Sequence, residues 1–314
     1  MKLKYAITTI FAWLISFSSS AAQYDDFSIT KIKDNIYNIS VNAGVVIGDD
    51  FVVLIEGGYG EYKDSNNKIV KAVKSITDKP IKYVINLHSH GDHNGGNNFF
   101  AERGATIITH QNIIYSWDYD TKYPKDSLIR FNDKLELDIG NDVLEIEHMI
   151  AHTFDDGVVY LKNSNVIFVG ESFKPNYMTY LGKLGMKSFD TWGEKALNKM
   201  DDETLVVPSH GHAVINKKQL IEYRTNVKHW FNRVKALFNQ GQDAATIAKD
   251  KIAESFVDKL NLDNNPNHHA KYYQNSIQGI LDSDIKNPLV LTQKQLHAYT
   301  GSYKVNGKPD IEVL

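Results

Sequence analysis

The chain has 314 residues, of which 42% are hydrophobic and 23% charged, the composition of an ordinary globular protein, and this excludes disorder, collagen and a polytopic membrane protein. The formal net charge is −3, too small to give an electrostatic footprint for nucleic acid or an anionic membrane. No cysteine is present, which excludes disulfides, thiolate zinc sites, iron–sulfur clusters and cysteine nucleophiles. Any metal site must therefore be built from His, Asp and Glu.

Residues 1–22 have the pattern of a secretory signal peptide. Lys2 and Lys4 precede an apolar stretch, Tyr5–Phe17, and small residues follow it up to Ala22, after which cleavage is expected. The alternative is an N-terminal membrane anchor, but the apolar stretch is shorter than the ~20 residues of a membrane span. The sequence therefore predicts a periplasmic or secreted protein that keeps no stable membrane insertion after cleavage.

The first half of the mature chain is predicted to be rich in strands. Alternating apolar and polar residues over Phe27–Glu56, many of them β-branched, predict three or four short antiparallel strands. Helical spacing follows at Asn66–Thr77, and KYVINL at Lys82–Leu87 is typical of a buried strand. The next predicted elements are a helix at Asn94–Arg103, a strand at Ala105–Thr109 and a short helix at Gln111–Tyr119.

In the second half, strands and helices alternate and helices then dominate. Lys217–Leu281 has a helical pattern with a break at Asn261–Pro266, and the tail is expected to form a short helix and a hairpin that turns at Asn306-Gly307. This order of elements indicates a mixed α/β or layered fold. Before the long helical region, strands are predicted near Asp142–His148, Gly157–Leu161, Val166–Val169 and Thr204–Val207, and a helix at Phe189–Met200.

Three histidines and an aspartate fall within one stretch, HSHGDH, directly after the buried strand KYVINL. Alternation along an extended chain points His88 and His90 the same way, whereas Asp92 and His93 lie around the turn and can face a second ion. Imidazole and carboxylate are ligands suited to zinc or iron. The alternative, a polar loop rich in histidine, is disfavoured by this density of ligand-type residues, so the sequence predicts a metal site at the rim of a sheet.

HSHGDH resembles the HxHxDH signature of the metallo-β-lactamase-fold hydrolases, and three later segments resemble further blocks of that family in the same order. They are IAHTFDDGVVYL with His152, VIFVGESF with Glu171 where the family usually has Asp, and VVPSHGHAV with His210. The resemblance implies an α/β fold, a four-layer αββα sandwich with two metals at the edge of its two sheets. We expect a catalytic domain at 23–240, a helical extension at 241–290 and a hairpin-like tail at 291–314.

The resemblance also implies a set of metal ligands and a cofactor. Glu171 would lie between two ions, the alternative being that it hydrogen-bonds a ligand histidine. The implied cofactor is a pair of Zn²⁺ ions, with iron or manganese as alternatives. The first ion would be held by His88, His90 and His152, and the second by Asp92, His93 and His210.

A family member of this kind would hydrolyse an ester, thioester, lactone or β-lactam-type bond of a small molecule, using a hydroxide that bridges the ions. Asp92 would bind metal and orient the hydroxide as the catalytic residue. A carboxylate at position 171 argues against a dedicated β-lactamase, whereas export argues for one. A β-lactamase proper with a His-type second site therefore stays an alternative. A metal-binding or ligand-binding protein without catalysis is another. Lys174 is expected to be solvated, although it could meet an anionic group of the substrate.

Overall fold

The computed structural model describes residues 28–40, 42–115, 123–175, 181, 184–264 and 273–282, together with the backbone of 301–303 and 311–313. The predicted signal peptide and the predicted turn at Asn306-Gly307 lie outside these residues. Within the described part of the chain, no helix has the length and apolar character needed to cross a membrane.

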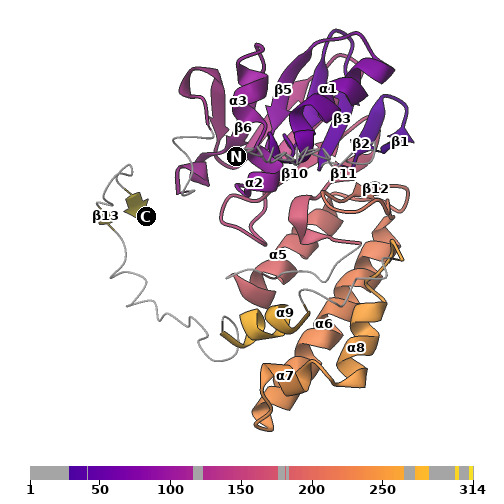
Figure 1. The fold of residues 1–314 in the computed structure, drawn as a ribbon, viewed down its shortest axis with the longest axis vertical. Coiled ribbons are helices and arrows are strands. Elements are labelled where there is room, and N and C mark those ends of the chain that lie inside the picture. The colour runs from indigo at the N-terminus through magenta and orange to yellow at the C-terminus, as the bar shows by residue number, and fades with distance from the viewer. Residues whose placement is uncertain are drawn as a thin grey trace, which may run out of the picture.

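The first sheet contains seven strands that lie side by side in sequence order (Figure 1). Of the three or four antiparallel strands predicted within Phe27–Glu56, the structure has four, and they pair antiparallel, whereas β4 to β7 are parallel. The strands are β1 (Ile29–Lys33), β2 (Ile36–Ile39), β3 (Ala43–Ile47), β4 (Val52–Ile55), β5 (Ile81–Ile85), β6 (Thr106–His110) and β7 (Leu128–Phe131).

The second sheet has five strands in the order β12-β11-β10-β9-β8, all antiparallel except the parallel pair β11 and β12. Its first strand, β8, and the last strand of the other sheet, β7, were not expected from the sequence. Both are short edge strands, and β8 alternates exposed charged residues with half-buried leucines, which weakens the apolar signal of a strand. The strands are β8 (Lys134–Asp138), β9 (Val143–His148), β10 (Gly157–Leu161), β11 (Val166–Phe168) and β12 (Leu205–Val207).

Helices cover the outer face of each sheet. Apolar residues of α1 (Ser65–Ile76) and α3 (Asn97–Ala101) pack on the first sheet, and five helices that follow β11 share one apolar core with the second sheet, the last of them extending away from it (Figure 1). The predicted four-layer αββα sandwich with C-terminal helices is therefore confirmed. The five are α5 (Gly185–Asn198), α6 (Lys217–Asn239), α7 (Ala244–Ile247), α8 (Lys251–Asp258) and α9 (Tyr273–Ile280). In the tail, β13 (Gly301–Tyr303) pairs antiparallel with β14 (Ile311–Val313).

Each central strand contributes to two cores, because successive side chains point to opposite faces of a sheet. In β4, Val53 and Ile55 lie in the core between the sheets, and Val52 and Leu54 lie in the core beneath the helices of the first sheet. This two-sided burial accounts for the unbroken apolar run of the strand. The third core joins Val158 and Ile167 of the second sheet to Trp192, Trp230 and Ile277 of the helices. The helices beyond residue 240 thus share one core with the second sheet.

Of the helix predicted at Asn94–Arg103, the structure has the shorter α3, and a turn at Gly95 and Gly96 separates α3 from α2 (Gly91–Asn94). The loop after β4 passes close to this turn. A Cβ atom on Gly96 would lie 2.3 Å from the carbonyl oxygen of Gly57, and one on Gly95 2.7 Å from the carbonyl carbon of Tyr59. Only glycine allows this approach, so the two loops pack backbone against backbone beside the HSHGDH segment.

Candidate metal centre

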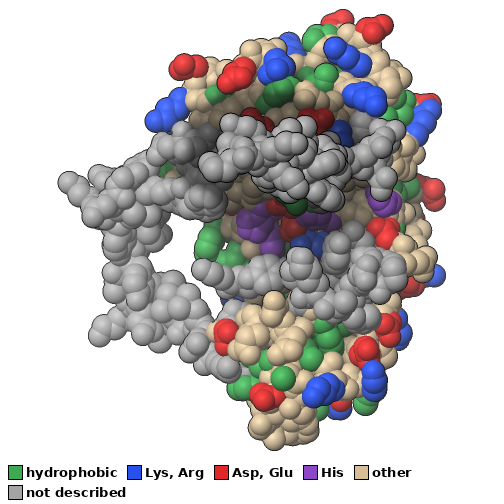
Figure 2. Space-filling model, viewed as in Figure 1, with side chains coloured by type: hydrophobic (Ala, Val, Ile, Leu, Met, Phe, Trp, Pro, Cys, Tyr) green, Lys and Arg blue, Asp and Glu red, His purple; other side chains and the backbone are tan. Residues whose placement is uncertain are grey.

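The predicted ligands meet where strands of both sheets end. β4 and β5 are parallel neighbours in the first sheet, and β11 and β12 in the second, so each pair ends at one edge. Glu171 follows β11, His210 follows β12, and His152 lies in the loop between β9 and β10. The structure brings all seven predicted residues into three overlapping groups, within each of which the candidate ligand atoms lie within 4.8 Å of one another. Figure 2 shows histidine side chains gathered in a hollow of the viewed face.

The first group contains the three histidines predicted for one ion, joined by Glu171. Nδ1 of His90 and Nε2 of His152 face each other 3.1 Å apart, and Glu171 Oε2 lies 3.4 Å from the same His152 nitrogen. Burial lowers the pKa of His90 to about 4 and that of His152 to about 3. Both imidazoles are therefore neutral at pH 7, the form in which histidine binds a metal.

The second group is the predicted trio of Asp92, His93 and His210. Asp92 Oδ2 lies 3.3 Å from His93 Nε2 and 3.2 Å from His210 Nε2, and these two nitrogens are 3.1 Å apart. Burial opposes ionisation of Asp92, but hydrogen bonds from the two histidines hold the pKa of its carboxyl well below its usual range. The three side chains therefore present one carboxylate oxygen and two ring nitrogens to a common point.

Glu171 lies between the two groups. It is held in a short 3₁₀ turn, η4 (Gly170–Ser172), which starts at a glycine with φ of 60°. Its Oε1 is 3.0 Å from His210 Nε2 and 2.6 Å from Lys174 Nζ. Burial would raise the pKa of Glu171, but Lys174 and the two nearby histidines hold it well below its usual range. The expectation of a solvated Lys174 is wrong, since this side chain is only 14% exposed and pairs with Glu171.

The sequence did not identify Glu56, a buried carboxylate beneath the centre. Glu56 directly follows β4, has φ of 70°, and places Oε1 3.5 Å from His88 Nδ1 and 3.4 Å from His93 Nδ1. The carboxylate thus faces both rings on their Nδ1 side, and the Nε2 atoms lie on the side of the candidate metal centre. Burial would lower the pKa of His93, but Glu56 and Asp92 outweigh it and raise the pKa to about 10. The feature of the sequence that could have indicated Glu56 is its place as an acidic residue directly after the apolar strand VVLI.

A second supporting carboxylate, Asp156, shapes the loop that carries His152. Its Oδ2 accepts hydrogen bonds from the backbone N–H groups of Ala151 (3.1 Å), His152 and Thr153 (2.8 Å). Asp156 is buried, and burial raises its pKa to about 6. These contacts fix the backbone on both sides of His152. In the sequence, the only sign of this role is an acidic residue four positions after the histidine.

The side chains present fit the metal that the sequence predicts. Among the residues that the structure describes, His88 Nε2 is buried without a hydrogen-bond partner, and Glu171 Oε2 accepts no hydrogen bond. A buried polar atom without a partner requires an explanation, and a cation that accepts these lone pairs supplies one. The donor set consists of imidazole nitrogens and carboxylate oxygens, which suits Zn²⁺ and also iron or manganese.

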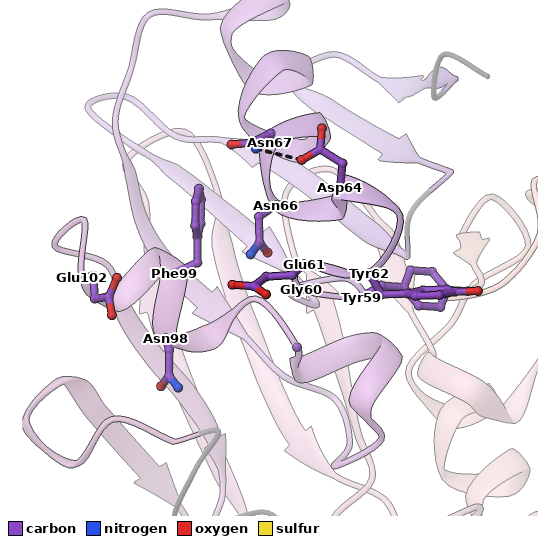
Figure 3. Close-up of a pocket in the computed structure, with 11 residues that line it drawn as sticks. Tyr59, Gly60, Glu61, Tyr62, Asp64, Asn66, Asn67, Asn98, Phe99 and Glu102 are labelled. Atoms are coloured by element: carbon purple, nitrogen blue, oxygen red, sulfur yellow. Dashed lines mark hydrogen bonds between the residues drawn. The ribbon is translucent and has the colours of Figure 1, made fainter. Parts of the chain in front are cut away.

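A separate hollow of about 690 Å³ lies beside α1 and α3 (Figure 3). None of the predicted metal ligands lines it. Its walls carry aromatic and acidic side chains, so it differs from the metal centre in position and in composition. Among its lining residues are Tyr59, Glu61, Tyr62, Phe99 and Glu102.

Comparison with known proteins agrees with the fold. Residues 37–212 match the model of the metallo-β-lactamase superfamily. A metallo-β-lactamase type 2 of Bacteroides fragilis is 23% identical over 222 residues, which cover 65% of this chain and 87% of that protein. One of Elizabethkingia meningoseptica is 24% identical over 228 residues, covering 67% of this chain and 88% of that protein.

Solved structures show the same fold. A metallo-β-lactamase from Pontibacter korlensis superposes with a TM-score of 0.55 at 21% identity and covers 64% of this chain and 99% of its own. A stereoselective inverting sec-alkylsulfatase from Pseudomonas sp. gives a TM-score of 0.62 at 15% identity and covers 82% of this chain and 50% of its own. The chain belongs to the metallo-β-lactamase superfamily, and the predicted class, a metal-dependent hydrolase, is confirmed.

Proposed function

We propose that the chain is an exported dinuclear zinc hydrolase that cleaves an ester, thioester, lactone or β-lactam-type bond in a small molecule. The observation that carries the proposal is the position of Glu171 between the two ligand groups. One of its oxygens lies 3.4 Å from His152 Nε2, and the other lies 3.0 Å from His210 Nε2. A carboxylate shared in this way balances two dications and holds their spacing.

His88, His90 and His152 would hold one ion, and Asp92, His93 and His210 the other. When bound, two divalent ions lower the pKa of a water molecule and polarise the oxygen of the bond to be cleaved. Asp92 is the most accessible of the three carboxylates at the centre, with 31% of its side chain exposed, compared with 6% for Glu171 and 2% for Glu56. It is therefore the carboxylate best placed to orient the attacking water.

Two exposed apolar side chains flank His152 and support a substrate with an apolar group. Phe154 is 61% exposed and Ile150 37% exposed. The backbone beneath the phenyl ring is fixed, because His148 Nε2 and Asn112 Nδ2 each lie 2.9 Å from the carbonyl oxygen of Phe154. An exposed phenylalanine on a fixed backbone next to a metal ligand is suited to contact a bound ligand. This geometry favours an acyl or ring substituent beside the bond that is cleaved.

The test is a panel of chromogenic esters, thioesters, lactones and cephalosporins assayed with zinc-loaded protein. We expect turnover of at least one class, and its loss in His152→Ala. Phe154→Ala should raise KM for substrates with a large apolar substituent and leave KM for their acetyl analogues unchanged. Two bound zinc ions with no turnover across the panel would instead support a binding protein without catalysis.

The second candidate is a β-lactamase proper. It is supported by the curated relatives from Bacteroides fragilis and Elizabethkingia meningoseptica, both named metallo-β-lactamase type 2. Turnover of the cephalosporin alone would favour this candidate. Turnover of an ester, thioester or lactone at a higher kcat/KM would favour the broader proposal.

A further inference from the structure

Asp263, in the loop after α8, connects the C-terminal helices to the metal centre. Its Oδ2 accepts a hydrogen bond from the backbone N–H of His212 at 2.8 Å, and its Oδ1 accepts one from Ala213 at 2.7 Å. These two amides lie two and three residues after His210, beyond Gly211 with φ of 86°. A carboxylate that accepts two adjacent amides makes charge-assisted bonds, which are stronger than those between neutral groups.

Asp263 also holds the segment that follows Glu171. Its backbone N–H donates to the carbonyl oxygen of Pro175 at 3.1 Å. Lys174, the residue before Pro175, is held by Tyr223 of α6. Tyr223 Oη accepts a hydrogen bond from the backbone N–H of Lys174 at 3.4 Å and donates one to its carbonyl oxygen at 3.3 Å. The C-terminal helices thus contact both ligand loops of the second sheet, and Asp263 contacts the two at once.

The loop that carries His210 is anchored at its base by the backbone pair of Val206 and Ile215, whose N–H groups donate to each other's carbonyl oxygens at 2.7 and 3.1 Å. Ser209 adds one longer bond to the carbonyl oxygen of Gly170, at 3.3 Å. Between His210 and Ile215, the hydrogen bonds that hold the backbone within the described part of the chain are those to the side chain of Asp263. The position of the His210 ring relative to Glu171 therefore depends on Asp263.

We propose that Asp263 is a positioning residue of the metal centre, which fixes the loops of His210 and Glu171 relative to each other and so sets the affinity of the second metal site. The inference rests on the proposed function, because it takes His210 as a ligand of that site. Groups that orient metal ligands from outside the coordination sphere typically contribute 10- to 100-fold to metal affinity.

The experiment is a zinc titration of the full chain in competition with a chromophoric chelator, well below the unfolding temperature. Asp263→Asn should weaken binding of the second zinc about tenfold or more and leave the first unchanged. Asp263→Glu keeps the charge and should recover part of the lost affinity. Asp250→Asn is the matched control, because Asp250 caps α8 and pairs with Arg233, away from both ligand loops. It should lower the melting temperature without changing either zinc affinity.

Equal second-site affinity in wild type and Asp263→Asn overturns the inference, even if the melting temperature falls. Loss of affinity in both Asp263→Asn and Asp250→Asn also overturns it, since the effect is then one of general stability. His210→Ala separates the inference from the proposed function. If the second zinc is lost in His210→Ala but retained in Asp263→Asn, only the inference fails. If wild type binds no second zinc, the dinuclear proposal fails, and the inference fails with it.

Discussion

Replacing Glu171 by glutamine tests the carboxylate that links the two ligand groups. Glutamine keeps the shape of the side chain but removes its charge and replaces one oxygen by an amide N–H₂. If the amide nitrogen takes the place of Oε1, both Lys174 (2.6 Å) and His210 (3.0 Å) face a donor, and if it takes the place of Oε2, His152 (3.4 Å) does. The change therefore removes both the proposed shared ligand and the counter-charge of Lys174.

We expect zinc occupancy at limiting zinc, or turnover, to fall by about tenfold or more, and a 10- to 100-fold loss corresponds to about 1.4–2.7 kcal/mol. Glu171→Asp keeps the charge and should retain more activity than Glu171→Gln. The assay is metal content after dialysis against limiting zinc, with kcat/KM measured on the same samples. Glu61→Gln, an exposed acid that lines the separate hollow, is the control and should behave as wild type.

A Glu171→Gln variant as active as wild type at limiting zinc refutes the shared-ligand role. Glu171 would then be structural, and the site would hold its metals with the histidines and Asp92. In that case the β-lactamase alternative becomes the better account of the function.

Glu56→Gln should weaken zinc binding about tenfold, because the variant keeps the shape of the side chain but loses the negative charge beside the rings of His88 and His93. Unchanged zinc affinity in the chelator titration counts against this role of Glu56. Glu145 should stabilise the fold above pH 5 and progressively less toward pH 2, because burial is outweighed by two lysines that lower the pKa of its carboxyl from 4.5 to about 2. Urea unfolding should show Glu145→Gln less stable than wild type by about 1–2 kcal/mol at pH 7, with solvent screening included, and the difference should shrink at pH 3; a difference that is constant with pH contradicts the linkage. Periplasmic protein should have the intact mass of a chain that begins after Ala22, and a mass that retains residues 1–22 favours a membrane anchor.

The part of the site that the sequence could predict is the part encoded locally. HSHGDH places four ligand-type residues on one turn directly after an apolar strand, and the spacing alone indicates two directions of coordination. The blocks around His152, Glu171 and His210 are likewise short segments in which a strand ends in a polar turn. The layered α/β architecture followed from the alternation of apolar patterns.

What the sequence could not predict depends on contacts between distant segments. In the sequence, Glu56 is only an acid that follows a strand. Its role depends on the pairing of β4 with β5, which brings it next to the imidazoles of His88 and His93. Asp263 meets amides 50 residues earlier in the chain. The exposure of Lys174 was predicted wrongly because its ion pair with Glu171, three residues earlier, forms only when the chain turns at η4. Strands β7 and β8 were missed because edge strands carry charges where central strands are apolar.

The central claim is that the chain holds two metal ions through two groups of ligands that share Glu171. The most direct measurement is the number of zinc ions bound per chain, determined by elemental analysis of zinc-reconstituted protein with His152→Ala and His210→Ala measured alongside. The account predicts about two ions in wild type and about one in each variant, the first site being lost in His152→Ala and the second in His210→Ala. No more than one ion in wild type, or two ions in either variant, contradicts it.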